Sequence, residues 1–111
     1  MKENREMVLF PTEDQFDQKY GELRLGACYW TIPFYPKNKE ALIGSKIYFY
    51  DKQVNVICLR ATITKFGEQD GKKAVFFDSE NEDDDFYLDL DGMGIEKRKQ
   101  TRGWAYKWFP I

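Results

Sequence analysis

The sequence predicts a mainly β (α+β) domain of six to seven short strands with one early helix, closed or nearly closed into a small barrel. The first observation is that residues 45–66 form two apolar stretches around a polar break at 51–53. Alternating side chains give each stretch one apolar face, as in a β-hairpin. The second is that the same alternation returns at 86–90 and 104–109. The third is that these short segments are spaced almost regularly, which is typical of small barrels.

The early helix is expected at about residues 13–20. Thr12 and Gln15 fit the capping-box pattern at its start, and Phe16 and Tyr20 would share one face. Residues 37–44 are expected to form a loop or one helical turn, and Asp70-Gly71 marks a turn within 67–73. The remaining strands are expected at 7–10, within 23–34, and at 74–77.

The composition excludes several kinds of chemistry. The chain has no His and no Cys-x-x-Cys pair, which excludes His-based triads and Cys/His zinc fingers. We therefore expect no cofactor and no metal, and no spacing singles out a catalytic residue. No apolar run approaches the ~20 residues of a membrane-spanning helix, and the first ten residues lack the apolar core of a signal peptide. These features predict a single cytoplasmic domain, residues 1–111, without a membrane partner.

Acidic residues are concentrated in one segment. The net charge is −2, yet residues 78–91 hold eight acidic residues and no basic one, so the rest of the chain is mildly basic. The low net charge therefore does not argue against nucleic-acid binding. The segment itself has three possible roles: an exposed loop without a function, a Mg²⁺ or Ca²⁺ site, or a surface that engages a protein partner by resembling nucleic-acid phosphates.

Aromatic residues make up 17% of the chain; two of them are adjacent at 29–30, and others interleave with basic residues at 102–108. Aromatic rings can stack on bases while Lys and Arg hold phosphates. The alternative is that most of these rings form the core. A cluster of basic residues at 97–99 could contact phosphates or could be an exposed connector. The candidate nucleic-acid-binding residues are Tyr29, Trp30, Tyr48, Arg102, Trp104 and Lys107.

The central hairpin resembles a known family. Residues 44–50 read Gly-x-x-Ile-Tyr-Phe-Tyr, and a polar turn and an apolar strand with Ala61-x-Ile63 follow. This pattern is similar to the central hairpin of the PUA-like superfamily, which includes PUA, ASCH and EVE domains. Tyr29-Trp30 also resembles the early Tyr-Trp strand of EVE domains. The resemblance implies a mixed-sheet pseudobarrel that binds RNA or modified bases.

Some ASCH-like members are hydrolases of modified nucleosides, with a Gly-x-Lys-Thr turn. Gly44 and Lys46 match that turn, but Ile47 stands where Thr is expected. The favoured function is therefore recognition of RNA or a modified base. The alternatives are a protein-interaction or inhibitor module that uses residues 78–91, and a nucleoside hydrolase that uses Lys46.

Overall fold

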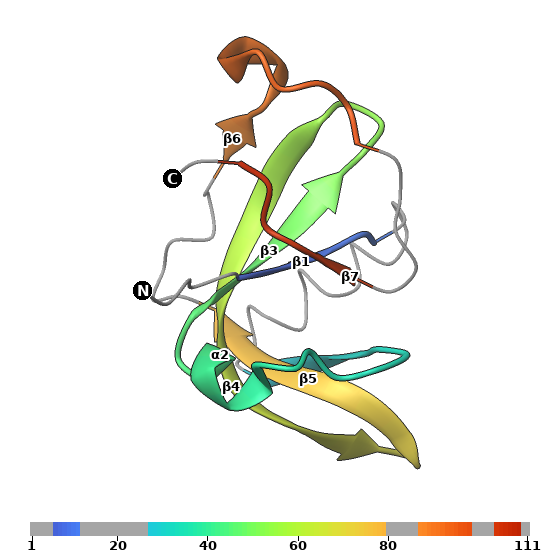
Figure 1. Cartoon of the computed structure of the whole chain (residues 1–111). Helices are drawn as coiled ribbons and strands as arrows, with labels where there is room; N and C mark the ends of the chain where they lie inside the picture. The colour runs from blue at the N-terminus through green and yellow to red at the C-terminus, as the bar shows by residue number, and fades with distance from the viewer. Residues whose placement is uncertain (1–5, 12–26, 80–86, 99–103, 110–111) are drawn as a thin grey trace.

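The computed structural model describes residues 6–11, 27–79, 87–98 and 104–109, and these form a mainly β structure (Figure 1). The expected helix at 13–20 lies outside the described residues. None of the described helices is long and apolar enough to cross a membrane. The elements are β1 (Met7–Leu9), β2 (Ala27–Thr31), α2 (Lys39–Leu42), β3 (Lys46–Asp51), β4 (Val56–Gln69), β5 (Lys72–Ser79), β6 (Leu88–Asp89), the 3-10 turn η1 (Asp91–Met93) and β7 (Trp104–Tyr106).

The strands form one mixed sheet in the order β2-β5-β4-β3-β1-β7, and β6 pairs with the start of β4. β1 runs parallel to β3, whereas the other pairs are antiparallel. The mixed sheet and the number of strands confirm the expected fold class. The sheet is not closed into a barrel, because β2 and β7 end the order and do not pair with each other in the described part of the chain.

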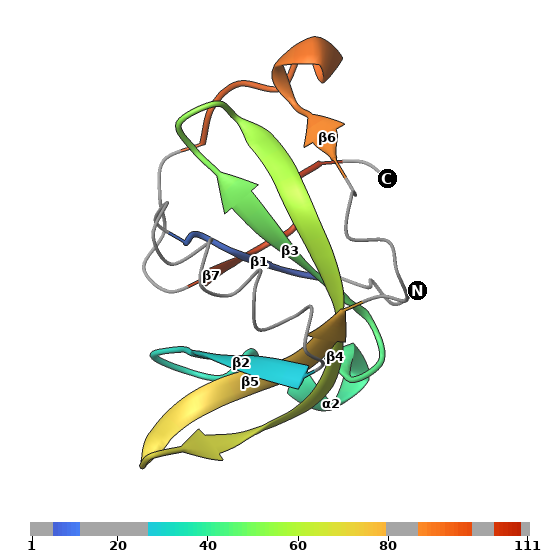
Figure 2. The same cartoon turned by 180° about the vertical axis from the view of Figure 1, so that it is seen from behind.

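β4 explains why the sheet bends without closing. Its first half pairs with β3 and its second half with β5, and the pairing shifts register between Ile63 and Lys65. Such a bulge adds one residue to a strand and increases its local twist. The β1-β3-β7 half of the sheet consequently turns over the β2-β5 half, and the two halves face each other across the core (Figures 1 and 2).

The predicted central hairpin at 45–66 is confirmed, with a longer second strand. β4 runs through Gly67 to Gln69, a region expected to be part of a turn. The turn is confined to Asp70 and Gly71, whose φ angles of 55° and 80° are both positive. Two successive residues in this conformation make a two-residue hairpin loop, which lets the flanking strands pair up to its edge. The single helical turn expected within 37–44 is α2.

Side chains on both faces of the β1-β3-β7 half are buried. One face joins the main core between the two halves, and the other forms a second cluster under β6 and the chain end. Ile47 and Phe49 enter the main core as expected, while Tyr48 and Tyr50 are buried in the second cluster. Leu88 and Leu90 also pack there, although β6 is shorter than the strand expected at 86–90.

The final strand was predicted to place Trp104, Tyr106 and Trp108 on one face. Trp104 and Tyr106 do lie together against the main core. β7 ends at Tyr106, so the alternation stops there. Trp108 and Phe109 both turn to the second cluster.

A buried hydrogen-bond network fixes the turn between β3 and β4. Asn55 is fully buried and left-handed, with φ 57°. Its side-chain oxygen accepts from the Tyr50 hydroxyl at 2.7 Å. Its amide nitrogen donates to a carboxylate oxygen of Asp91 and to the carbonyl of Ile95, each at 2.7 Å. Buried polar groups are tolerated when all are paired in this way, so Asn55 ties the hairpin turn to the segment after β6.

Asn55→Gly should lower the free energy of unfolding by about 2–3 kcal/mol, because the buried partners of the amide lose their hydrogen bonds. Asn55→Ala should cost about 1 kcal/mol more, since a Cβ disfavours the left-handed conformation that Gly accepts. Urea denaturation followed by circular dichroism measures both. Gln53→Ala, in the exposed part of the same turn, is the control. Wild-type stability of Asn55→Gly would contradict a stabilising role of the network.

Candidate nucleic-acid interface

The carboxylate of Glu6, just before β1, joins three segments of the chain. One oxygen accepts from the Tyr48 hydroxyl and from the Lys107 ammonium group, both at 3.0 Å. The other oxygen accepts from the backbone N–H of Lys46 at 3.3 Å. The Lys107 N–H also donates to the Glu6 carbonyl at 2.7 Å. Because both charged side chains are largely buried, with 16% and 18% of their area exposed, Glu6 holds Lys107 in one place.

Three basic side chains from separate elements surround Tyr48. The Lys107 nitrogen lies 5.7 Å from the centre of its ring. Arg60 on β4 is its cross-strand partner, so the two side chains share a face of the sheet. Lys46 lies two residues earlier on β3, on the same face, and its ammonium group donates to the Thr62 hydroxyl at 3.5 Å. We call Lys46, Arg60 and Lys107, with Glu6 and Tyr48, the Tyr48 patch.

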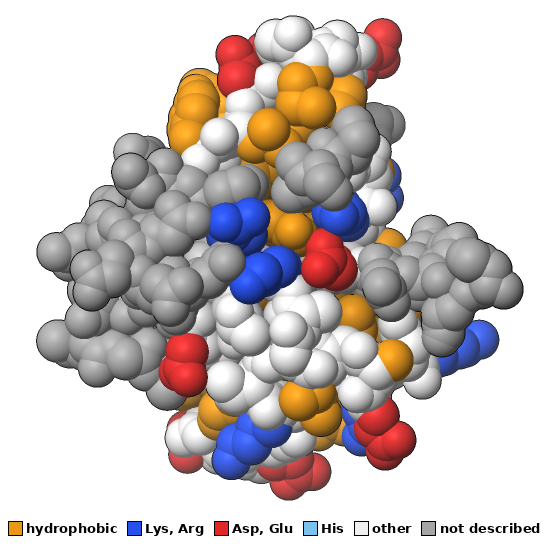
Figure 3. All heavy atoms as spheres, turned by 90° about the vertical axis from the view of Figure 1, so that its left-hand side faces the viewer, with side chains coloured by type: hydrophobic (Ala, Val, Ile, Leu, Met, Phe, Trp, Pro, Cys, Tyr) orange, Lys and Arg blue, Asp and Glu red, His pale blue; other side chains and the backbone are white. Residues whose placement is uncertain are grey.

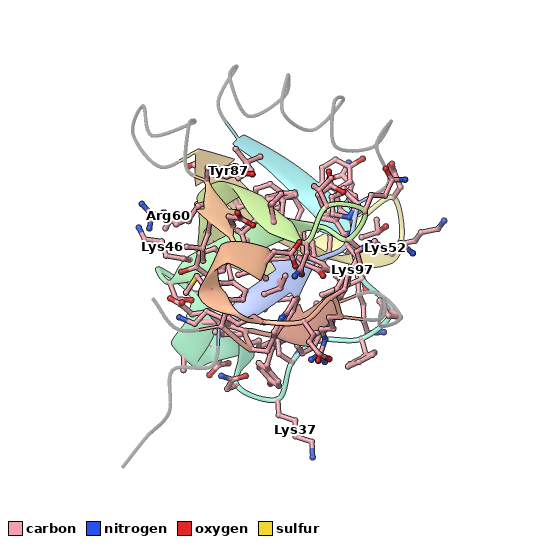
Figure 4. All side chains as sticks on the ribbon, turned by 90° about the horizontal axis from the view of Figure 1, so that it is seen from above. Lys37, Lys46, Lys52, Arg60, Tyr87 and Lys97 are labelled. Atoms are coloured by element: carbon pink, nitrogen blue, oxygen red, sulfur yellow. The ribbon has the colours of Figure 1, made fainter. Side chains whose placement is uncertain are left out.

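Two residues of this patch, Lys46 and Arg60, can be located in the figures. Figure 4 shows Lys46 and Arg60 next to each other on the left. Figure 3 looks at that side, and there basic side chains gather around an acidic one near the middle of the face. Guanidinium and ammonium groups held by a sheet are suited to contacting phosphate oxygens, Arg in a bidentate manner and Lys as a point charge. Asp78 lies near the rim of the patch, since it is the cross-strand partner of Thr62.

The patch brings together two of the six predicted site residues, Tyr48 and Lys107. Only 2% of Tyr48 is exposed, because Phe109 packs on its ring at 5.4 Å between centres. Its burial leaves no ring face for stacking on a base. Tyr48 is therefore a support for the cations around it in this structure. Arg102 lies outside the described residues.

Two other predicted residues, Trp30 and Trp104, contribute to the main core. Trp104 is 5% exposed, and its indole N–H donates to the Phe34 carbonyl at 3.1 Å. Trp30 is partly buried and packs edge-on against Phe49 at 6.3 Å. The two tryptophans thus converge on a filled core. This agrees with the alternative that most of the aromatic rings form the core.

Tyr29 lies on the opposite face of β2 from Trp30. Its ring is 5.9 Å from that of its cross-strand partner Phe76. The Lys65 nitrogen, in turn, lies 4.7 Å from the centre of the Phe76 ring. Tyr29 therefore belongs to a separate row of side chains across β2, β5 and β4, away from the two tryptophans.

The basic cluster expected at 97–99 is described in part. The Arg98 guanidinium lies 4.6 Å from the centre of the Trp108 ring, which stacks on Phe10 on the second cluster. The Arg98 N–H donates to the Tyr50 hydroxyl at 3.0 Å. This end of the connector is thus attached to the aromatic cluster.

Half of the acidic segment, residues 80–86, lies outside the described residues, and this half contains five of its eight acidic residues. Beyond it, Tyr87 is 64% exposed and lies on the left of the molecule in Figure 4, as do Lys46 and Arg60. No group of three or more Cys, Asp or Glu side chains suited to a metal occurs in the described part of the chain.

Sequence reasoning missed Glu6 and Arg60. Arg60 interrupts an apolar strand, and this could have been a signal. If the strand register of the predicted hairpin had been assigned, Arg60 would have been placed opposite Tyr48. Glu6 carries no such signal, because its partners at 46, 48 and 107 come from distant parts of the chain. Lys46, the residue proposed for a hydrolase, is a neighbour of Arg60 in this patch.

No protein-family model matches the chain, and neither a curated protein nor a solved structure matches it.

Trp104→Ala should lower the free energy of unfolding by about 3–5 kcal/mol, the usual cost of emptying a core position of this size. Chemical denaturation measures the change. The matched control is Tyr87→Ala, which removes a largely exposed aromatic ring and should change stability by less than about 0.5 kcal/mol. If Trp104→Ala keeps wild-type stability but loses nucleic-acid binding, Trp104 is a ligand contact and not a core residue.

Proposed function

We propose that the protein is a cytoplasmic nucleic-acid-binding module whose Tyr48 patch contacts phosphates, with RNA or a modified nucleic acid as its ligand. The observation that carries the proposal is the convergence of Lys46, Arg60 and Lys107, from three different elements, around one buried tyrosine. Cations positioned in this way provide the sequence-independent part of nucleic-acid affinity. The resemblance of the central hairpin to PUA-like domains supports the same ligand class.

The way in which bases are held differs from the sequence-based expectation. Trp30 and Trp104 pack in the core, so stacking would have to come from another aromatic ring. Tyr87 is a candidate, because it is 64% exposed and lies on the same side of the molecule as Lys46 and Arg60. An exposed ring on the same side of the molecule as a basic surface can stack on an unpaired base, which favours a single-stranded ligand.

Binding can be tested by fluorescence anisotropy of labelled single-stranded RNA, single-stranded DNA and duplex DNA between 50 and 200 mM salt. Lys46→Gln, Arg60→Gln and Lys107→Gln should each weaken binding of single strands. Each should also reduce the slope of log affinity against log salt concentration by about 0.7, because one phosphate contact is lost. Tyr87→Ala should weaken binding without changing that slope.

Lys37→Gln is the matched control. Lys37 is exposed and points away from Lys46 and Arg60 (Figure 4), so its removal should leave affinity and salt slope close to wild type. Circular dichroism and unfolding midpoints establish that each variant is folded. Equal losses in Lys37→Gln and Lys46→Gln would show that only net charge matters. Absence of binding to any nucleic acid at 50 mM salt would reject the proposal.

A further inference from the structure

A second group of cations surrounds Tyr35, in the segment between β2 and α2. The Tyr35 hydroxyl donates to the carbonyl of Gly67 on β4 at 2.7 Å. Its ring packs edge-on against Phe66, with 6.1 Å between centres. The ring is therefore held at both its edge and its hydroxyl, against the second half of β4.

Two ammonium groups approach this one ring. The Lys39 nitrogen lies 4.2 Å from the ring centre, and the Lys73 nitrogen lies 5.8 Å from it. The two nitrogens can thus be no farther apart than about 10 Å, which is the screening length in about 0.1 M salt. An aromatic ring attracts each cation, but the cations repel each other. Among the described side chains, neither lysine forms an ion pair with a carboxylate.

A hollow of about 450 Å³ lies beside Lys73, between the end of β2 and the β4–β5 hairpin. The residues that line it include Thr31, Pro33, Glu68, Gly71, Lys72 and Lys73. Lys72 and Lys73 follow directly on the tight turn at Asp70 and Gly71, so their backbone is fixed by the hairpin. The hollow therefore has Lys72 and Lys73 at its wall, and Lys73 also shares the Tyr35 ring with Lys39, which does not line the hollow.

Carboxylates near the hollow work against an anion. Glu68 is the cross-strand partner of Lys73 and shares its face of the sheet. Glu40 on α2 and Asp70 in the turn are exposed nearby in the chain. An anion that binds must compete with the Glu68 carboxylate for Lys73, so Glu68 should lower the affinity of the site for anions.

We propose that Lys39 and Lys73, with Lys72 at the rim, form a binding site for a phosphate group beside the Tyr35 ring. A phosphate between the two ammonium groups would accept hydrogen bonds from both and remove their mutual repulsion. This site is distinct from the Tyr48 patch, because Glu68 lies eight residues farther along β4 than Arg60. It therefore does not depend on the nucleic-acid function proposed above.

The site is tested by titrating ¹⁵N-labelled protein with inorganic phosphate and with pyrophosphate, at an ionic strength held constant with potassium chloride. Amide signals of Gly71, Lys72 and Lys73 should shift and saturate. Lys39→Gln and Lys73→Gln should each weaken the fitted affinity at least fivefold, whereas Glu68→Gln should strengthen it. Unfolding midpoints check that these exposed or partly exposed substitutions leave the fold intact.

Lys46→Gln separates this site from the Tyr48 patch. It should leave the phosphate affinity unchanged even if it abolishes oligonucleotide binding. Signals that move equally with potassium chloride alone, or that move in Lys73→Gln as in wild type, would overturn the proposal. So would shifts caused by a single-stranded oligonucleotide but not by either small phosphate, because these would assign the lysines to nucleic-acid binding.

Discussion

The structure depends on the backbone hydrogen bonds of β4, which are shared among three strands. The strand pairs with β3 along its first half, with β5 along its second half, and with β6 at its start. The bulge between Ile63 and Lys65 lets one continuous strand serve both halves of the sheet. The core between the halves exists because β4 changes direction there. Both proposed sites lie along this strand: Arg60 in its first half belongs to the Tyr48 patch, and Glu68 in its second half is the cross-strand partner of Lys73.

The aromatic residues are explained mainly by burial on both faces of the β1-β3-β7 half. A sheet that is covered on both faces needs apolar side chains at successive positions. β3 meets this need with Ile47, Tyr48, Phe49 and Tyr50, all buried. Tyrosines on one of these faces keep their hydroxyls paired, to Glu6 and to Asn55. An alternation of Ile or Phe with Tyr can therefore indicate two buried faces, which differ in polarity.

The fold class and the central hairpin could be predicted because both depend on local patterns. Alternation along 45–66 is a property of neighbouring residues, and so is the turn signal at Asp70-Gly71. The residues of the candidate interface could not be chosen in the same way. Tyr48 and Trp104 were selected as exposed aromatic rings, but their burial depends on Phe109 and Phe34, which are remote in the sequence. Lys107 was selected as a nucleic-acid-binding residue and lies beside Tyr48, while Glu6, which positions it, has no local signal.

The ion pair between Glu6 and Lys107 has a consequence for the order of assembly. These residues are 101 positions apart, and the strands beside them, β1 and β7, pair with each other. During synthesis β1 leaves the ribosome early and can pair with β3, but its other edge has no partner until β7 is made. Among the strand pairs of the sheet, β1 and β7 are the two that lie farthest apart in the sequence, so their contacts are the most non-local ones. The Tyr48 patch is therefore complete only when synthesis of the chain has reached Lys107, and a nascent chain cannot engage a ligand through it before that point.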